Sequence, residues 1–141
     1  MQNFHNAAYR EEEREMYPTL KVSRLHLLAL KCRARSQQLF GVGAIPWSPL
    51  CRGFLARPWQ AEETLRVKTD ANYKARGIHL PDKSRQTINE RVEEIAKKRG
   101  LTMAQVALAW SLGNDNITAP IVGTTKLDNL KELIGAFGRA W

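Results

Sequence analysis

Gly41-Val42-Gly43-Ala44-Ile45-Pro46-Trp47-Ser48-Pro49-Leu50-Cys51-Arg52-Gly53 is the stretch that decides how the chain is expected to fold. Its short apolar run, 42–45, lies between glycines and prolines, a pattern typical of a buried parallel strand that leads into a polar loop. The loop then carries an indole, a hydroxyl, a guanidinium and a glycine. Past the carboxyl end of a strand, these groups suit an aromatic ring joined to phosphates. The stretch therefore predicts half of a nucleotide site.

A second stretch of similar design, Ala-Pro-Ile-Val-Gly-Thr-Thr-Lys, occupies 119–126. A β-branched run ends at Gly123, and two hydroxyls and Lys126 then open an expected helix over 127–137. Free amides and the positive end of the dipole at a helix start favour an anion, and the lysine adds a full charge. The alternative is a plain helix cap with a solvated lysine. Two strand-loop-helix units with phosphate chemistry at the same end suggest one ligand.

Length and composition indicate one modest globular domain. The chain has 141 residues, of which 43% are hydrophobic and 26% are charged, and this composition excludes wholesale disorder. Its formal net charge of +8 allows a polyanionic partner. However, four of the basic residues fall within 22–38, where aromatic side chains are not interleaved with the charges. Nucleic acid is therefore a disfavoured partner.

Cysteine usage and the lack of long apolar runs indicate a cytoplasmic protein without a membrane partner. Cys32 and Cys51 have neither the number nor the spacing of a disulfide framework or a zinc site, so we expect free thiols and no metal. The first residues lack the basic and apolar regions of a signal peptide. No apolar run approaches the length that spans a membrane.

Periodicity and capping patterns predict the order strand, helix, strand, long loop, two helices, strand, helix. The acidic run 11–15 is expected to form a solvated helical face that Pro18 ends. The segment 55–80 is expected to be a long loop over the mouth of the site, in which Trp59 and Tyr73 either contact substrate or pack on the body. This order is a parallel α/β arrangement.

The three later helices carry start and stop signals. Asp82 or Ser84 caps a helix that runs to about Arg99, and Gly100 ends it. A capping box at 102–105 starts a second helix, and similar logic at Thr125 starts the last. The last helix is expected to bury one apolar stripe, formed by Leu130, Leu133, Ile134 and Phe137.

Four motifs carry a family resemblance: MQNFHN with YREEEREM at 1–6 and 9–16, GVGAIPWSPLCRGFL at 41–55, MAQVALAW at 103–110, and APIVGTTK at 119–126. Together they resemble the C-terminal part of an aldo-keto reductase of the aryl-alcohol dehydrogenase-like branch. The resemblance covers nearly the whole chain except 22–38 and the last four residues. It implies that 1–137 form part of a (β/α)8 TIM barrel, roughly its last three βα units.

The resemblance also implies NADP(H) as the cofactor and gives each matching residue a role. Gln2 would hydrogen-bond the nicotinamide carboxamide, and Trp47 would stack on the nicotinamide ring, although a core aromatic is the alternative for this tryptophan. The residues that would line the pyrophosphate are Ser48, Leu50, Arg52 and Gly53. Those that would hold the 2′-phosphate are Gly123, Thr125 and Lys126. The adenosine end would meet Asn129 and Glu132, with Leu133 departing from an asparagine that is common there.

No catalytic residue is assigned. The family transfers hydride between NADPH and an aldehyde or ketone, with a tyrosine, lysine, histidine and aspartate from the first half of the barrel. No tyrosine or histidine of this chain lies in a matching context. We therefore expect this oxidoreductase-family chain to be inactive alone, and to meet a small carbonyl or alcohol substrate only when the other half-barrel completes it. The alternative is a non-catalytic NADP(H)-binding or subunit-interaction module.

Residues 22–38 interrupt the resemblance. Removing them joins Lys21 to Leu39 at the spacing that the family shows between a helix and the seventh strand. The codons for Val22-Ser23 and Gln38 can match splice-donor and splice-acceptor sequences. We interpret the segment as a translated intron, with a genuine surface insertion as the alternative.

Overall fold

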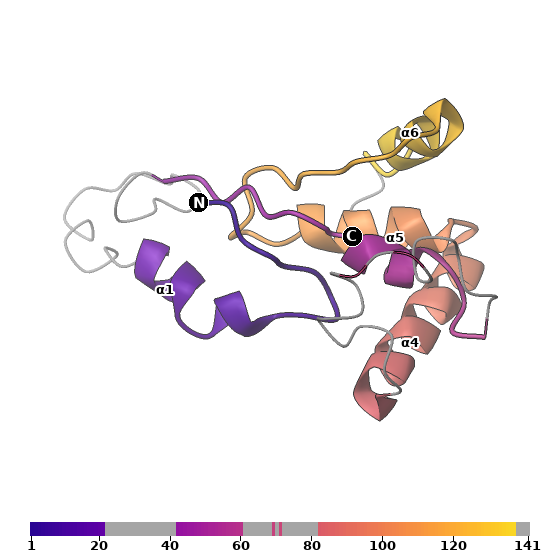
Figure 1. Ribbon diagram of the computed structural model, residues 1–141, viewed down its shortest axis with the longest axis horizontal. Coiled ribbons are helices and arrows are strands. Elements are labelled where there is room, and N and C mark those ends of the chain that lie inside the picture. The colour runs from indigo at the N-terminus through magenta and orange to yellow at the C-terminus, as the bar shows by residue number, and fades with distance from the viewer. Residues whose placement is uncertain (22–41, 61–68, 70, 72–81, 138–141) are drawn as a thin grey trace.

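The computed structural model describes residues 1–21, 42–60, 69, 71 and 82–137 (Figure 1). Its elements are, in chain order, the 3-10 helix η1 (Glu11–Glu13), α1 (Met16–Lys21), the 3-10 helix η2 (Cys51–Ala56), α4 (Lys83–Arg99), α5 (Met103–Leu112) and α6 (Leu127–Ile134). The segment 22–38, interpreted as a translated intron, and most of the expected loop over the site lie outside the described residues.

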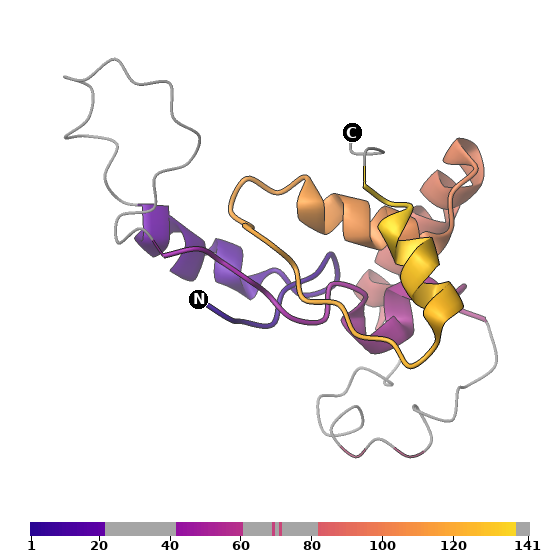
Figure 2. The ribbon, with the colours of Figure 1, turned by 90° about the horizontal axis from the view of Figure 1, so that it is seen from above.

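Three extended segments, 1–5, 42–47 and 117–122, run side by side with the second in the middle (Figures 1 and 2). Parallel bridges join Phe4 to Trp47 and Trp47 to Ile121. The Trp47 amide donates to the Asn3 carbonyl at 2.8 Å, and the Ile121 amide donates to the Pro46 carbonyl at 2.8 Å. The segments therefore have the parallel direction that the sequence predicted.

Full strands were also expected, and within the described residues the pairing stays at isolated bridges instead. Prolines explain part of this difference. Pro46 in the middle segment and Pro120 in the third have no N–H to give to a ladder. The middle segment therefore forms fewer regular hydrogen bonds than an uninterrupted strand would.

The main core lies where η2, α4 and α5 meet (Figure 2). Its buried members come from all three elements and are Cys51, Leu55, Val92, Ala96, Met103, Val106 and Ala107. On α4, Val92 and Ala96 are four residues apart and so share one helix face. A second cluster joins α5 to α6 through Ala104, Leu108, Leu133 and Ala136. A third places Tyr17 and Leu20 of α1 against Ala44 of the middle segment.

The expected start and stop signals of α4 and α5 are confirmed. Asp82 accepts a hydrogen bond from the Ser84 amide at 2.8 Å, and Gly100 ends α4 with a φ of 63°. Thr102 and Gln105 form the complete capping box of α5, with both contacts at 3.2 Å. Satisfying these end groups fixes where each helix begins and ends.

Two helix predictions are wrong. Pro18 does not end a helix, because α1 begins at Met16 and contains it. The proline occupies the first turn, where a missing N–H breaks no helical hydrogen bond. The start of α6 is also different, since Lys126 is its N-cap and the hydroxyl that bonds there belongs to Thr124 rather than Thr125.

The buried stripe expected on α6 is only partly correct. Leu133 is buried, whereas Leu130, Ile134 and Phe137 are 37%, 56% and 64% exposed. The helix contacts α5 through Leu133 and the Glu132 carbonyl, with Ala136 in the turn after it, and projects away from the rest of the described chain (Figure 1). The other apolar residues of α6 therefore remain uncovered by the described residues.

Candidate functional site

The candidate site lies where the second and third extended segments end. Because these segments are parallel, the loops that follow them, 48–53 and 123–126, leave from the same edge. Leu50 of the first loop and Val122, just before the second, pack against the same α5–α6 cluster. The structure thus brings the two stretches that carry hydroxyl, guanidinium and ammonium groups to one end of the described chain.

Trp47 stands at the centre of this end and is half-buried. Its indole contacts the Phe4 ring, with centroids 4.6 Å apart, and the guanidinium carbon of Arg52 lies 5.7 Å from the indole centroid. A cation at this distance from an indole is a favourable electrostatic contact. Trp47 is therefore neither a fully buried core residue nor a freely exposed one.

The loop after Trp47 has an unusual backbone. Ser48, Cys51 and Arg52 all have positive φ values, 61°, 49° and 56°, and Gly53 follows at 94°. L residues rarely adopt this left-handed region, and such strain concentrates at functional sites. The Ser48 hydroxyl oxygen accepts a hydrogen bond from the Arg52 amide at 2.8 Å. Its own O–H can then donate to another group, such as a phosphate oxygen.

Burial removes Cys51 from any reactive role at this site. Desolvation raises the pKa of its thiol to about 11, and the charges of Arg85 and Arg52 oppose that rise only in part. A protonated thiol is a poor nucleophile. Cys51 therefore acts as the residue of this loop that packs into the core.

The second loop is open to solvent. Gly123, Thr125 and Lys126 are all exposed, and a Cβ added at Gly123 would meet no atom within 4 Å. The Thr124 hydroxyl accepts from the Lys126 amide at 3.2 Å, which shapes the turn into α6. A helix start beside a lysine is a suitable place for an anion, although Asp128 in the first turn weakens the field there.

The remaining candidate residues are placed on both sides of these loops. Gln2 is exposed and lies two residues before Phe4, so the two side chains share a face of their extended segment. Asn129 is exposed on α6. Glu132 is half-buried, and its carbonyl accepts from Gln105 of α5 at 2.9 Å. Gln2 and Asn129 thus point into solvent from different elements.

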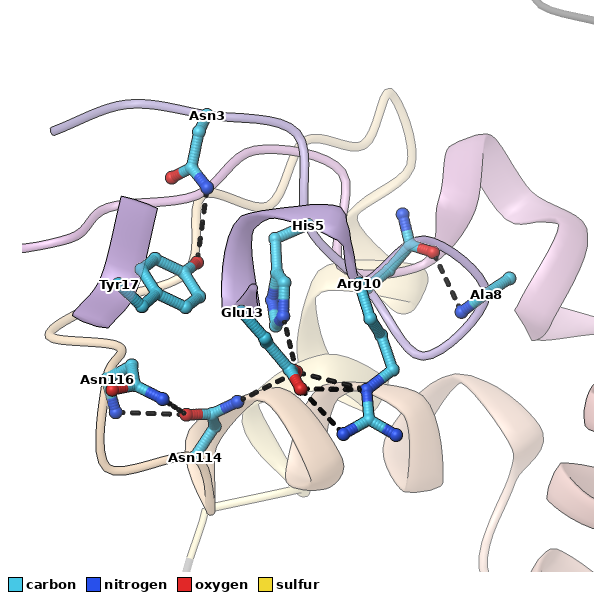
Figure 3. A network of polar contacts seen from close by, with 9 residues as sticks. Asn3, His5, Ala8, Arg10, Glu13, Tyr17, Asn114 and Asn116 are labelled. Atoms are coloured by element: carbon cyan, nitrogen blue, oxygen red, sulfur yellow. Dashed lines mark hydrogen bonds and ion pairs between the residues drawn. The ribbon is translucent and has the colours of Figure 1, made fainter. Parts of the chain in front are cut away.

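A polar network at the opposite side of the first segment was missed by the sequence analysis (Figure 3). His5 is fully buried, and its Nε2 lies 2.9 Å from Glu13 Oε1. Arg10 donates to both Glu13 oxygens, and Asn114, which follows α5, donates to Oε1 at 3.4 Å. The His5 ring also stacks on Trp110, with centroids 5.4 Å apart.

The expectation of a fully solvated acidic run is therefore wrong for Glu13. Its burial alone would raise the pKa of the carboxyl, but hydrogen bonds from Arg10 and His5 outweigh it, so the pKa lies below the ordinary value. The network ties the first segment and η1 to the end of α5. The only signal in the sequence was that a histidine, His5, lies eight residues before Glu13 of the acidic run.

The described ranges hold neither a metal site nor a membrane-spanning helix. No three histidine, cysteine, aspartate or glutamate side chains there gather as a metal site would require. None of the helices in the part of the chain that the structure describes is long and apolar enough to cross a membrane.

The described residues thus form three parallel extended segments with helices between them, and two polar loops leave these segments at one edge. The aldo/keto reductase family model matches residues 13–140, and the chain belongs to this family. The versiconal hemiacetal acetate reductase of Aspergillus parasiticus is 43% identical over 136 residues, which are 96% of this chain and 34% of that protein. A Schizosaccharomyces pombe protein that carries the name putative aryl-alcohol dehydrogenase is 44% identical over 137 residues, 96% of this chain and 33% of that protein.

A third relative is an aldo-keto reductase of Metarhizium robertsii, 39% identical over 140 residues, which are 99% of this chain and 32% of that protein. The chain therefore spans about a third of the length of these relatives. The expected family resemblance, including its aryl-alcohol dehydrogenase-like character, is confirmed.

Proposed function

We propose that this chain carries the NADP(H)-binding end of an aldo/keto reductase barrel, formed by roughly the last three of eight βα units. Three parallel segments with helices between them support this assignment. The span of about a third of the relatives' length agrees with it. In such barrels, phosphate sites follow the last two strands. Here these positions correspond to the two loops of the candidate site.

The observation that carries the proposal is the arrangement of Trp47, Ser48 and Arg52. The half-buried indole of Trp47 is the proposed contact of the nicotinamide ring, and Gln2 shares a face of the first segment with Phe4, which touches that indole. The Arg52 guanidinium stands over the same indole, and the Ser48 hydroxyl has a proton to donate. Together they would offer contacts for a ring and for phosphates at the end of the middle segment and in the loop after it, which Leu50 anchors to the core.

At the other end of the ligand, the open space at Gly123 admits a phosphate close to the backbone. Thr125 and Lys126 would hold the 2′-phosphate, and Asn129 and Glu132 would face the adenosine. A bound NADP(H) supplies hydride chemistry to a carbonyl or an alcohol. The residues of this chain bind and orient it. The groups that move the proton are proposed to come from the rest of the barrel, so the 141-residue chain alone is expected to reduce no aldehyde.

Titration of the Lys126→Ala variant tests this proposal. A lysine-phosphate contact is expected to contribute about tenfold to affinity, so the Kd for NADPH should rise about tenfold while the Kd for NADH stays the same. Lys131→Ala is the matched control, because Lys131 is an exposed lysine of the same helix beyond its first turn. Equal effects of the two substitutions on NADPH would contradict the proposed 2′-phosphate site.

A second candidate function is pairing with another reductase chain or half-barrel. It is favoured by the α6 stripe, the exposed apolar residues Leu127, Leu130, Ile134 and Phe137. Their spacing places them along one helix face, and such faces mark interaction surfaces. Ile134→Glu should abolish the pairing of this chain with the other reductase chain or half-barrel, as sedimentation detects it, while the Kd for NADPH stays the same. Assembly that survives this change would argue against the surface. The proposed setting for either function is the cytoplasm.

A further inference from the structure

Asn6 is a fully buried side chain that joins two loops. Its exposed fraction is 0%. Its Oδ1 accepts from the Ala8 amide at 3.0 Å, and its Nδ2 donates to the Ser48 carbonyl at 3.2 Å. Because a backbone amide only donates and a carbonyl only accepts, the two contacts fix the orientation of the carboxamide. Asn6 is therefore anchored through its own turn and holds Ser48 from outside the loop.

Ser48 is the residue at which the chain leaves the middle segment, and its left-handed backbone requires support. Its carbonyl also accepts from the Cys51 amide at 2.9 Å, which closes the first turn of the loop. With Cys51 and Arg52 also at positive φ, three L residues hold a conformation that is strained for each of them. Strained backbone persists only where surrounding contacts over-determine it. The Asn6 carboxamide is such a contact.

We propose that Asn6 is a positioning residue for the cofactor. Its carboxamide holds the loop from Trp47 to Gly53 in the shape that receives the nicotinamide and pyrophosphate parts of NADP(H). This inference rests on the proposed function and adds a residue that touches no part of the ligand. Since Asn6 acts through Ser48, its loss should weaken the ligands that use this loop and spare those that do not.

The test compares two probes on the 141-residue chain. NADPH uses the whole site, whereas adenosine 2′-monophosphate carries the adenosine and the 2′-phosphate without either phosphate of the pyrophosphate and without the nicotinamide. Asn6→Ala removes one buried hydrogen bond to the loop and leaves the Ser48 carbonyl with less support. The Kd for NADPH should rise about tenfold, and the Kd for adenosine 2′-monophosphate should change less than about twofold.

Asn3→Ala is the matched control. Asn3 is a buried asparagine three residues before Asn6, but its side chain donates to the Tyr17 hydroxyl at 3.3 Å and not to the loop. This substitution should lower the melting temperature while the ratio of the two dissociation constants stays at the wild-type value. A general loss of packing and a loss of loop shape are thus measured separately.

Ser48→Gly provides a second route. Glycine adopts positive φ without the cost that a side chain brings, so the loop needs less support from Asn6. In a chain that already carries Ser48→Gly, the further change Asn6→Ala should therefore raise the Kd for NADPH by clearly less than tenfold. If Asn6→Ala alone lowers the folded fraction too far for titration, this pair of chains gives the comparison.

The outcomes separate the inference from the proposed function. An unchanged NADPH affinity in Asn6→Ala overturns the positioning role and leaves the proposed function intact. Equal weakening of both probes also overturns it, because Asn6 would then support the whole fold. A wild-type chain that binds neither probe overturns the proposed function itself.

Discussion

Replacing Asn89 with alanine should loosen the base of the candidate loop and lower stability. Asn89 is a polar residue of α4 with a 1% exposed fraction, and it donates to two carbonyls at the end of η2, Phe54 at 2.7 Å and Arg57 at 3.0 Å. The substitution removes two buried hydrogen bonds at about 1 kcal/mol each and leaves two carbonyls less satisfied, so the free energy of unfolding should fall by about 2–4 kcal/mol.

The oxygen of the Asn89 carboxamide reduces this loss of free energy of unfolding. Asn89 Oδ1 has no hydrogen-bond partner among the described residues, so removing the side chain also removes a buried polar atom worth about 1 kcal/mol. The net decrease in the free energy of unfolding is therefore about 2 kcal/mol, which lowers Tm by roughly 6–10 °C in a chain of this size. Urea unfolding followed by circular dichroism measures it.

Thr87→Ala is the matched control on the same helix. Thr87 is exposed, and its hydroxyl bonds to the Lys83 carbonyl within α4. Alanine has the higher helix propensity, so this change should leave stability within about 0.5 kcal/mol. A loss below about 0.5 kcal/mol for Asn89→Ala would refute the reasoning, because the two carbonyls would then not depend on Asn89.

Three further predictions concern other described residues. Cys51 should resist alkylation at about pH 8 in the folded chain and react in denaturant, because burial raises its pKa to about 11. Rapid labelling of the folded chain on the peptide that contains Cys51, separated from the peptide that contains Cys32, would contradict this. The folded-state pKa of Glu13 is depressed, so its contribution to stability is present above the ordinary value of 4.5 and is lost as pH falls through the folded pKa. Glu13→Gln should therefore flatten the pH dependence of Tm below about pH 5. An unchanged slope of Tm against pH would count against the network. Gly100→Ala should cost about 1 kcal/mol in urea unfolding because Gly100 ends α4 at a φ of 63°, whereas no loss would mean that the helix end can rearrange.

Local signals in the sequence were enough to predict the caps of α4 and α5 and the parallel direction of the three segments. A cap depends on residues within one turn, as Asp82 and the Thr102–Gln105 box show. Parallel direction follows from strands that alternate with helices. The family was also predictable, because its motifs are continuous stretches of sequence.

Long-range contacts could not be predicted in the same way. Glu13 is held by His5, Arg10 and Asn114, and the last of these is 101 residues away in sequence. Asn89 reaches η2 across 35 residues. Burial of a polar side chain depends on a partner that only the fold supplies, and no periodic pattern records it.

For α6 the sequence predicted more burial than the described chain provides. Its apolar spacing indicates a buried stripe, but the described chain covers only Leu133 and Ala136. Periodicity predicts that a face will be covered without saying what covers it. The sequence was enough to predict that the loops 48–53 and 123–126 lie at one edge, whereas the left-handed backbone at Ser48 and Arg52 could not be predicted from it.

Calorimetric titration of the 141-residue chain with NADPH and with NADH tests the central claim most directly. The account predicts saturable one-to-one binding of NADPH, with NADH bound about tenfold more weakly because it lacks the phosphate that Lys126 would meet. Absence of binding by either nucleotide would contradict the claim that this chain carries the NADP(H)-binding end of the barrel.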